Sequence, residues 1–382
     1  MMNDFDINKI QNETNEINYI LNKCKEEKRT IVLFGAGENG LMNLKYFRKY
    51  GLSDDLVFCD NDPDKHGTLI DGIPVISIND LKTKYKNSSI VITPRIGHDE
   101  ISLQLKENNL DKNIINQSHE QTIISEIQFY EDYRNYYNVI YDNRYMFAQL
   151  FKILSDDKSK VIFYDRLNYC ITANSKYLIP MTSKNVQYFD SDIFKLTKDE
   201  ILIDGGAFTG DTAEAFILQT NGEFSKIYSF EPEKDKHSDF LNKYSSYKNI
   251  ELIPCGLWRK KDMLKFSAEN TGSSRLNEYG NTEINVISID EFLNGRPVTL
   301  IKMDIEGAEL DALRGAEKTI KKYRPKLAIC AYHNPLDIVN IPLYIKELIP
   351  EYKIYLRHYY ENSSETVCYA ILDTKKMENE NE

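Results

Sequence analysis

The sequence predicts an α/β protein with two Rossmann-like parallel sheets, a small one in the N-terminal third and a larger one in the C-terminal half. Two segments, 30–40 and 201–211, each read as an apolar strand that runs into a glycine-rich turn and a helix start. In both cases the next strand ends in an acid about 20 residues after the turn, Asp60 and Glu231, a spacing typical of nucleotide-binding α/β folds. The last quarter of the chain adds two strands joined by a polar loop, a pattern that closes the larger sheet.

Length and composition limit the class of protein. The chain has 382 residues and a net charge of −11, and 28% of its residues are charged. At ~150 residues per domain, this length predicts two or three domains. No apolar run approaches the ~18 residues of a membrane-spanning helix, and residues 1–11 lack the apolar core of a signal peptide. We therefore expect a cytoplasmic protein with no membrane span. Nucleic-acid binding needs clustered cations, so we expect no nucleic-acid partner for this acidic chain.

The six cysteines are dispersed along the chain, and none forms a C-x-x-C pair. Most of them lie in or beside predicted strands, where a thiol behaves as a small apolar side chain. We therefore expect free thiols in a reducing compartment and no structural zinc.

A Rossmann-like N-terminal domain is expected over residues 1–118. Its predicted elements are helices at 7–28, 41–50, 79–85 and 99–108, strands at 30–34, 56–59, 90–93 and 113–115, and a hairpin at 69–76. The first strand runs into a G-x-G-x-x-G turn, and this context predicts a nucleotide site formed by Gly35, Gly37, Gly40 and Asp60. The alternative is a fold retained without a ligand, which would serve assembly or position an acceptor.

An aromatic-rich helical connector is expected over residues 119–160. Its apolar side chains recur at three-, four- and seven-residue steps on one face, at Phe129, Tyr133, Tyr136, Ile140, Phe147 and Phe151. This face is typical of a helix that packs on its neighbours, and a sugar-stacking or dimer surface is the alternative. The last domain is expected over 161–376, and its first part, 161–200, forms a cap region without clear periodicity.

Three motifs lie at predicted strand ends in the C-terminal half. They are DGGAFTG at 204–210, FEP at 230–232 and VTLIKMDIEGAEL at 298–310. Together they resemble the FkbM-type methyltransferase family, which depends on S-adenosylmethionine, over about residues 185–372. Shorter matches are GSSR at 272–275, ISIDEF at 287–292 and YH at 332–333. The N-terminal domain resembles the Rossmann-like domains of nucleotide-sugar-linked acyltransferases and of some two-domain FkbM-type enzymes.

The resemblance implies a class I methyltransferase sheet that ends in a β-hairpin. The final predicted elements agree, with a strand at 326–331, a helix at 342–349 and strands at 352–356 and 367–372. A dinucleotide dehydrogenase half would instead add a crossover helix and a further parallel strand. The pattern therefore favours S-adenosylmethionine over NAD in this half.

The resemblance also implies which residues bind the cofactor. They are Asp204, Gly206, Ala207, Gly210, Asp211, Glu231 and Pro232. In this interpretation the glycines let the backbone approach the cofactor, Asp204 orients the turn near the methionyl ammonium, and Glu231 accepts hydrogen bonds from the ribose diol. The alternatives are that Asp204 only caps backbone amides and that Glu231 is a solvated strand end.

Methyl transfer to a hydroxyl needs alignment of donor and acceptor and one base. The candidates are His333, Asp304 and Glu306, which are expected at the ligand-binding edge of the sheet. Asp304 could instead cap the helix predicted at 308–323, and a lone histidine is usually structural. His358, at the end of the sixth strand, is a further candidate. A metal site built from Asp304, Glu306 and His333 is not expected, because no short ligand spacing supports it.

The sequence therefore predicts an S-adenosylmethionine-dependent O-methyltransferase. The expected partner is a small-molecule or glycan acceptor, with the methyl group placed on a sugar hydroxyl of a glycan or its precursor in polysaccharide biosynthesis. One alternative is an NAD-dependent nucleotide-sugar oxidoreductase or epimerase that uses the N-terminal turn, although no Tyr-x-x-x-Lys dyad lies near that domain. Another is a non-catalytic binding protein that retains the fold. Whether the chain forms a homo-oligomer is open.

Overall fold

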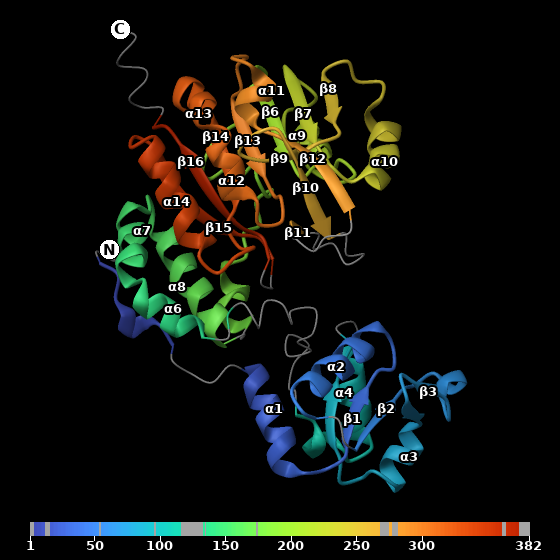
Figure 1. Cartoon of the computed structure of the whole chain (residues 1–382). Coiled ribbons are helices and arrows are strands. Elements are labelled where there is room, and N and C mark those ends of the chain that lie inside the picture. The colour runs from blue at the N-terminus through green and yellow to red at the C-terminus, as the bar shows by residue number, and fades with distance from the viewer. Residues whose placement is uncertain are drawn as a thin grey trace. The chain divides into compact units, whose positions relative to one another are not determined.

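The computed structural model of the chain forms two compact units. It describes residues 4–11, 16–52, 55–94, 97–115, 133, 135–172, 175–267, 275–276, 282–360 and 364–373. The N-terminal unit comprises Asn8–Val139 and Arg166–Leu178, and the C-terminal unit comprises Met1–Ile7, Ile140–Asp165 and Ile179–Glu382. Each unit has its own sheet (Figure 1).

The N-terminal unit is built on a five-stranded sheet in the order β3-β4-β2-β1-β5. Its strands are β1 (Ile31–Phe34), β2 (Leu56–Cys59), β3 (Leu69–Ile70), β4 (Ile73–Ile76) and β5 (Ser89–Ile92). All neighbours pair in parallel except β3 and β4, which form the expected hairpin. The strand expected at 113–115 is wrong, because Asp111–Asn113 is a 3-10 helix and Ile114 makes a single bridge to Ile90.

Helices cover both faces of this small sheet. They are α1 (Glu16–Glu27), α2 (Glu38–Lys49), α3 (Ile78–Thr83) and α4 (His98–Glu107). Alternate strand residues point to opposite faces, so Ile31 and Leu33 pack with α1 and α2 while Val32 and Phe34 pack with α3 and α4. Burial on both faces explains why the strands read as continuous apolar runs.

The C-terminal unit is built on a seven-stranded sheet in the order β15-β16-β14-β13-β6-β7-β8. Its strands are β6 (Ile201–Gly205), β7 (Lys226–Phe230), β8 (Ile250–Ile253), β13 (Leu300–Met303), β14 (Lys326–Cys330), β15 (Lys353–His358) and β16 (Thr366–Ile371). Strands β8, β7, β6, β13 and β14 pair in parallel, and β16 pairs antiparallel with both β14 and β15. The predicted Rossmann-like methyltransferase sheet with a closing hairpin is therefore confirmed.

Two layers of helices enclose the seven-stranded sheet (Figure 1). They are α9 (Asp211–Gln219), α10 (Lys234–Tyr244), α11 (Ile289–Leu293), α12 (Glu309–Arg314), α13 (Glu317–Tyr323) and α14 (Asp337–Leu348). Phe216 of α9 and Phe240 of α10 pack on Leu202 and Leu300 of the strands. On the other side, α14 contacts β16 and α12. This packing fixes the strand ends that carry the candidate site.

A second, four-stranded sheet lies in the C-terminal unit and was not predicted. Its order is β11-β10-β12-β9, formed by β9 (Gly256–Leu257), β10 (Asp262–Ser267), β11 (Arg275–Leu276) and β12 (Thr282–Ile287). Ile284 and Val286 of β12 alternate with polar residues and are buried, a period-2 signal that the sequence contained. The GSSR match at 272–275 lies outside the described residues, except for Arg275.

A long helix occupies part of the region expected to be an irregular cap. After α6 (Tyr136–Asp142) and α7 (Arg144–Ile153), α8 runs over Asp157–Thr172. Ile162, Phe163, Leu167 and Cys170 of α8 are all buried. A helix buried on most sides shows no single apolar stripe, which explains why the periodicity was not visible.

The predicted helix 308–323 is split into α12 and α13. Gly315 lies at the break, where a β-carbon would strike the carbonyl oxygen of Trp258 and lie 2.9 Å from Cβ of Ser288. The carbonyl of Gly315 accepts a hydrogen bond from the amide of Asp290. Tertiary contacts therefore end a helix that the local sequence alone would continue.

Among the described residues, no helix is both long and apolar enough to cross a membrane.

We expect Asp156→Asn to destabilise the C-terminal unit. Nη2 of the buried Arg357 lies 2.6 Å from Oδ2 of Asp156, and loss of that carboxylate leaves a buried guanidinium without its counter-charge. The expected loss is about 2 kcal/mol in the free energy of unfolding, measured by chemical denaturation. The matched control is Asp157→Asn, whose side chain is exposed and should change stability by less than about 0.5 kcal/mol. Equal effects of the two variants would contradict this.

Candidate active site

The candidate site lies where the carboxyl ends of four adjacent strands meet. The strands β7, β6, β13 and β14 are neighbours in the sheet, and ligands of open α/β sheets bind beyond such ends. Glu231 follows β7, the glycine turn 206–210 follows β6, Asp304 follows β13 and His333 follows β14. The structure thus brings together the residues that the sequence placed at separate strand ends.

Two glycines of the turn are required by the packing of the protein itself. Gly206 and Gly210 have φ values of 74° and 90°, which favour glycine. A β-carbon on Gly206 would strike the carbonyl of Asp304, and one on Gly210 would strike the ring of Tyr244. The hydroxyl of Tyr244 also donates to the carbonyl of Gly210 at 2.6 Å. The glycines therefore let the turn pack closely against β13 and α10.

Glu231 ties the glycine turn to the end of β7. Its Oε2 accepts a hydrogen bond from the amide of Phe208 at 2.8 Å, and its Oε1 accepts one from the amide of Glu233 at 2.8 Å. Burial raises the pKa of Glu231 to about 7, although both amides act in the opposite direction. The carboxylate is therefore oriented by the backbone, and it is not the solvated strand end considered as its alternative role.

Asp204 lies beneath the turn, fully buried, as half of an ion pair. Nζ of Lys302, on the neighbouring strand β13, lies 3.0 Å from Oδ1 of Asp204. The same ammonium donates to the carbonyls of Gly205 at 3.1 Å and Gly206 at 2.9 Å. Burial raises the pKa of Asp204 to about 6, although Lys302 opposes this. Asp204 thus orients the turn through Lys302.

The other residues assigned to cofactor binding flank the turn. Ala207 is fully buried, Asp211 is the exposed first residue of α9, and Pro232 is half-buried. Phe208 differs from them because it is a large apolar residue that is 51% exposed. Its backbone φ is 47°, in the left-handed region. Phe208 therefore offers an apolar surface beside the turn.

Asp304 is held by three donors rather than by a helix terminus. Its Oδ2 accepts from the hydroxyl of Tyr188 at 2.9 Å, its Oδ1 accepts from that of Tyr332 at 3.2 Å, and Nε2 of His333 lies 3.3 Å from Oδ1. Burial would raise the pKa of Asp304, but the hydrogen bond and charge of His333 hold it well below its usual value. Asp304 is therefore an ionised carboxylate at the ligand edge. The helix-capping alternative does not fit, because the N-cap position of α12 is Ala308 and no side chain caps this helix.

His333 is buried among carboxylates. Its Nδ1 lies 3.0 Å from Oε1 of Glu309, while its Nε2 faces Asp304 and lies 3.7 Å from Oε2 of Glu306. Burial would lower the pKa of His333, but the charge of Glu309 and the hydrogen bonds to Asp304 and Glu309 raise it well above its usual value. An imidazole that keeps its proton at neutral pH donates hydrogen bonds and accepts no proton. This arrangement disfavours the general-base role that the sequence suggested for His333.

Three residues around Asp304 have backbone conformations that side-chain-bearing residues rarely adopt. The φ values are 67° for Tyr188, 56° for Glu306 and 68° for Glu365. Such conformations cost energy and cluster at functional sites. The side chain of Glu306 is 31% exposed, so it does not lie in the core.

Sequence reasoning missed four residues of this site. They are Tyr188, Lys302, Glu309 and Glu365. Lys302 had a readable signal, because it interrupts the apolar strand 298–303. Glu309 lies within a quoted motif, but its role depends on a histidine from another strand. Tyr188 and Glu365 come from segments without a motif.

Among the residues that the structure describes, two groups of side chains bring three possible ligand atoms within 4.8 Å of one another. One comprises Asp304, Glu309 and His333, and the other comprises Asp304, Cys330 and Glu365. In the first group both imidazole nitrogens face carboxylates. In the second, burial raises the pKa of the Cys330 thiol well above its usual value, and a metal ligand must be a thiolate. The structure therefore does not assign these residues as metal ligands.

His358 does not open onto this site. It is fully buried on β15, and its Nδ1 lies 2.9 Å from Oγ1 of Thr366 on β16. Its position supports a structural role.

The turn of the N-terminal unit repeats the arrangement around Glu231. Asp60 accepts hydrogen bonds from the amide of Ala36 in the turn at 2.7 Å and from that of Asp62 at 2.9 Å. Six residues later in the chain, His66 contacts the carbonyl of Asp60 at 2.8 Å, just as His237 contacts that of Glu231 at 2.8 Å. The surroundings of Asp60 differ from those of Glu231 in one contact, an ion pair in which Nζ of Lys65 lies 3.0 Å from Oδ2 of Asp60.

The three glycines of this turn have different surroundings. A β-carbon on Gly35 would strike Pro94, and one on Gly40 would strike the carbonyl of Gly35. A β-carbon on Gly37 would meet open space, and its φ of −110° suits any residue. Gly37 is therefore the position at which added bulk would report a ligand without disturbing the protein.

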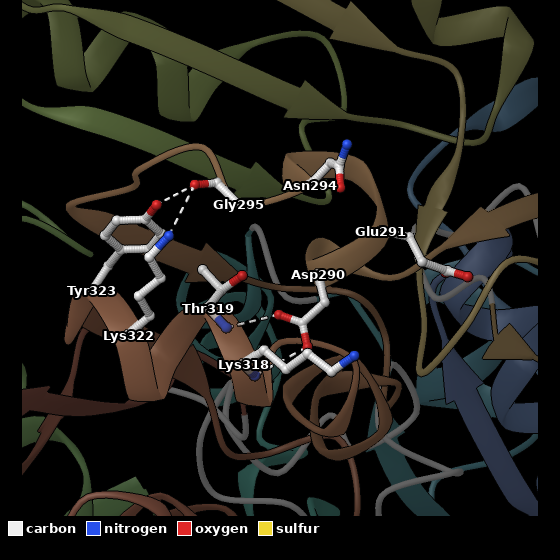
Figure 2. A pocket seen from close by; sticks show the side chains of 8 residues that line it. All are labelled: Asp290, Glu291, Asn294, Gly295, Lys318, Thr319, Lys322 and Tyr323. Atoms are coloured by element: carbon white, nitrogen blue, oxygen red, sulfur yellow. Dashed lines mark hydrogen bonds between the residues drawn. The ribbon is translucent and has the colours of Figure 1, made fainter.

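A separate pocket of about 350 Å³ lies between α11 and α13 (Figure 2). Its residues are Asp290, Glu291, Asn294, Gly295, Lys318, Thr319, Lys322 and Tyr323. Asp290 accepts from the amides of Lys318 at 3.0 Å and Thr319 at 2.8 Å. Figure 2 shows Lys322 and Tyr323 turned toward the carbonyl of Gly295. These groups join the two helices, and none of the predicted site residues lines the pocket.

Two family models match the chain. Residues 204–359 match the methyltransferase FkbM domain, and residues 3–114 match the C-methyltransferase C-terminal domain. The first match contains the glycine turn, Glu231, Asp304 and His333, so the family resemblance inferred from the motifs is confirmed. Residues 204–359 are therefore similar to a methyltransferase FkbM domain. Because the second family is named for C-methylation, the matches leave the accepting atom open.

Several of the solved structures that resemble the chain are described as methyltransferases or methylases. Methyltransferase FkbM from Methylobacillus flagellatus shares 23% identity over 95% of this chain and 94% of its own, with a TM-score of 0.70. An rRNA methylase from Streptococcus thermophilus shares 18% identity over 47% of this chain and 90% of its own (TM-score 0.31). Aeropyrum pernix fibrillarin with bound S-adenosyl-L-methionine shares 14% identity over 46% of this chain and 67% of its own (TM-score 0.29). The first similarity shows a shared fold. No curated protein sequence matches the chain.

We expect His333 to remain protonated through neutral pH. Its folded-state pKa lies above the unfolded value of ~6.5, so its contribution to stability is complete below that value and is lost only as the pH rises through the higher folded-state pKa. The measurement is an NMR titration of histidine ring resonances, with the His333 signal identified by its absence from His333→Gln. The imidazolium signal should persist from pH 6 to about 8. A midpoint near 6.5 would contradict the ion cluster.

Proposed function

We propose that the C-terminal unit transfers the methyl group of S-adenosylmethionine to a hydroxyl oxygen, and that the acceptor is a sugar hydroxyl of a glycan or its precursor. One observation carries the proposal. Glu231 is fixed by two backbone amides at the end of β7, directly beside the glycine turn of β6. This is the position from which an acid reaches a ribose diol in nucleotide-binding sheets.

The residues around Glu231 fit an adenosyl cofactor. Each carboxylate oxygen has two lone pairs, and each already accepts from one amide. One lone pair on each oxygen therefore remains, which suits two adjacent hydroxyls. The exposed ring of Phe208 offers an apolar surface at the same edge. The free amides at the start of α9 favour a ligand carboxylate.

Bound S-adenosylmethionine would supply a methyl group already activated by a sulfonium. The chain must then hold the acceptor oxygen in line and remove its proton. The ionised Asp304 favours a nearby positive charge, and its three donors fix its direction. Glu306, half-exposed at the opening, can accept a hydrogen bond from a hydroxyl of the acceptor. His333 orients Asp304 as a charged donor.

The sugar acceptor is supported by the arrangement of the N-terminal unit. Its turn repeats the geometry of Glu231 around Asp60, and the space over Gly37 is open. A nucleotide held there would suit a nucleotide-linked sugar precursor in the cytoplasm. Carboxylates and tyrosine hydroxyls around Asp304 can bond sugar hydroxyls.

We expect the chain to bind S-adenosylhomocysteine in a pH-dependent way. Ribose hydroxyls bond to the ionised form of Glu231, whose free pKa is raised to about 7, so binding should release a proton and weaken as the pH falls below that value. Calorimetry at pH 6 and 8 checks this. Glu231→Gln should cost about 1–3 kcal/mol at pH 8 and remove the pH dependence.

The matched control is Glu233→Gln, which keeps the backbone amide that Glu231 uses. This variant should bind like the wild type. If the wild type gives no heat with S-adenosylhomocysteine but binds NAD, the proposed transfer fails in favour of a dinucleotide enzyme.

We expect methyl transfer from labelled S-adenosylmethionine to a nucleotide-linked sugar, detected by mass spectrometry of a panel of such sugars and their free monosaccharides. If the N-terminal turn holds the nucleotide part, Gly37→Val should raise the KM for the linked acceptor and leave S-adenosylhomocysteine affinity unchanged, because a side chain there fills open space. An unchanged KM would assign the N-terminal turn to scaffolding. A methyl group found on carbon would refute O-methylation.

A further inference from the structure

We infer that Glu365 is the general base of the active site, the group that takes the proton of the acceptor hydroxyl. The inference rests on the proposed methyl transfer to oxygen. Glu365 directly precedes β16 and faces Asp304 across two tyrosine hydroxyls. It thus lies at the same sheet edge as the glycine turn, on the side of Asp304.

Glu365 and Asp304 share the same two hydroxyl groups. The hydroxyl of Tyr332 lies 3.2 Å from Oδ1 of Asp304 and 3.3 Å from Oε1 of Glu365. The hydroxyl of Tyr188 lies 2.9 Å from Oδ2 of Asp304 and 3.4 Å from Oε2 of Glu365. The side-chain amide of Gln187 also donates to Oε2 of Glu365. Four oxygen–oxygen contacts therefore connect two carboxyl groups through two phenols.

A count of protons separates the two carboxyl groups. Burial raises the pKa of Tyr188 and of Tyr332, so each phenol keeps its single proton. The two phenol protons can occupy only two of the four oxygen–oxygen contacts. If Asp304 and Glu365 are both ionised, two contacts join lone pairs of electrons and are unfavourable. One proton on Glu365 fills a third contact, so the arrangement raises the affinity of this carboxylate for a proton.

Charges on the surrounding elements keep that proton off Asp304. The titratable groups that face Glu365 are Asp304 after β13, Cys330, Tyr332 and His333 at the end of β14, and Tyr188 before β6. His333 and Lys302 hold Asp304 ionised. Burial and the charge of Asp304 raise the pKa of Glu365, and they outweigh Gln187, His333 and Tyr332. Two carboxyl groups pushed apart in this way are a pattern of acid–base sites.

The backbone holds Glu365 in place. Its φ of 68° and that of Tyr188, 67°, are both in the left-handed region that favours glycine. The carbonyl of Glu365 accepts a hydrogen bond from the amide of Tyr359 at 3.1 Å, across the β15–β16 connection. A strained position that is fixed by its surroundings suits a group that must meet a reacting atom.

The proton step is balanced as follows. The acceptor O–H bond breaks, and its proton moves to the ionised carboxylate of Glu365. The electron pair of the acceptor oxygen forms the new O–CH₃ bond, and the pair of the broken S–CH₃ bond remains on the donor sulfur, which becomes a neutral thioether. The added proton fills one of the empty contacts with a tyrosine oxygen.

The first test follows the carboxyl group without any acceptor. Infrared difference spectra between the wild type and Glu365→Gln should show a carboxyl whose proton is lost at a higher pH than that of an ordinary glutamate. In Asp304→Asn the same loss should occur at lower pH, because the neighbouring negative charge is gone. A Glu365 carboxyl that is ionised from pH 5 upward would overturn the inference.

The second test measures transfer to the nucleotide-linked sugar that the wild type methylates. Glu365→Gln should bind S-adenosylhomocysteine like the wild type and slow transfer by ~10²- to 10⁴-fold. The wild-type rate should fall as the pH drops through the titration of Glu365. Glu351→Gln, at an exposed carboxylate before β15, is the control and should transfer normally. Transfer by Glu365→Gln within a few-fold of wild type would overturn the assignment, whereas absent S-adenosylhomocysteine binding by the wild type would refute the proposed function itself.

Discussion

The buried ion pair between Lys302 and Asp204 is the interaction on which the candidate site depends. Burying either charge alone would be strongly unfavourable, so strands β13 and β6 must stay in the register that brings them together. The same ammonium bonds the carbonyls of Gly205 and Gly206 and so sets the start of the glycine turn. One side chain from β13 therefore fixes the glycine turn that leaves β6, and its charge also acts on Asp304, two residues further along.

Opposite charges alternate from the interior to the opening of the site. Lys302 pairs with Asp204, and its Nζ lies 5.0 Å from the ring centre of Tyr188. His333 lies between Glu309 inside and Asp304 at the edge. Lys302 and His333 are each paired with a buried carboxylate, Asp204 and Glu309. The groups at the outer edge of the site are acids and phenols. The edge is therefore electronegative, which suits a cationic methyl donor and a hydroxyl that must lose a proton.

Much of the fold could be predicted because its signals are local. Apolar strands that end in glycine turns or acids gave the two parallel sheets, and the final pair of strands gave the closing hairpin. Tertiary packing hid the rest. Helix α8 is buried over most of its length, and the break at Gly315 depends on the distant carbonyl of Trp258. At the site, strand ends located Glu231, Asp304 and His333, but the protonation of His333 depends on Glu309, and Glu365 approaches Asp304 through a fold-level contact that no motif records.

The acids of the two glycine turns, Asp60 and Glu231, have pKa values shifted in opposite directions. Asp60 is bonded to Lys65, and although burial opposes it, hydrogen bonds from Asp62, Ala36 and Lys65 lower its pKa. Glu231 lacks such a lysine partner in the described structure, and its pKa is raised to about 7. A modest acidification would therefore protonate one acid and leave the other charged. The chain contains an acid-sensitive and an acid-resistant version of the same turn, so a fall in pH changes the charge of one turn and not of the other.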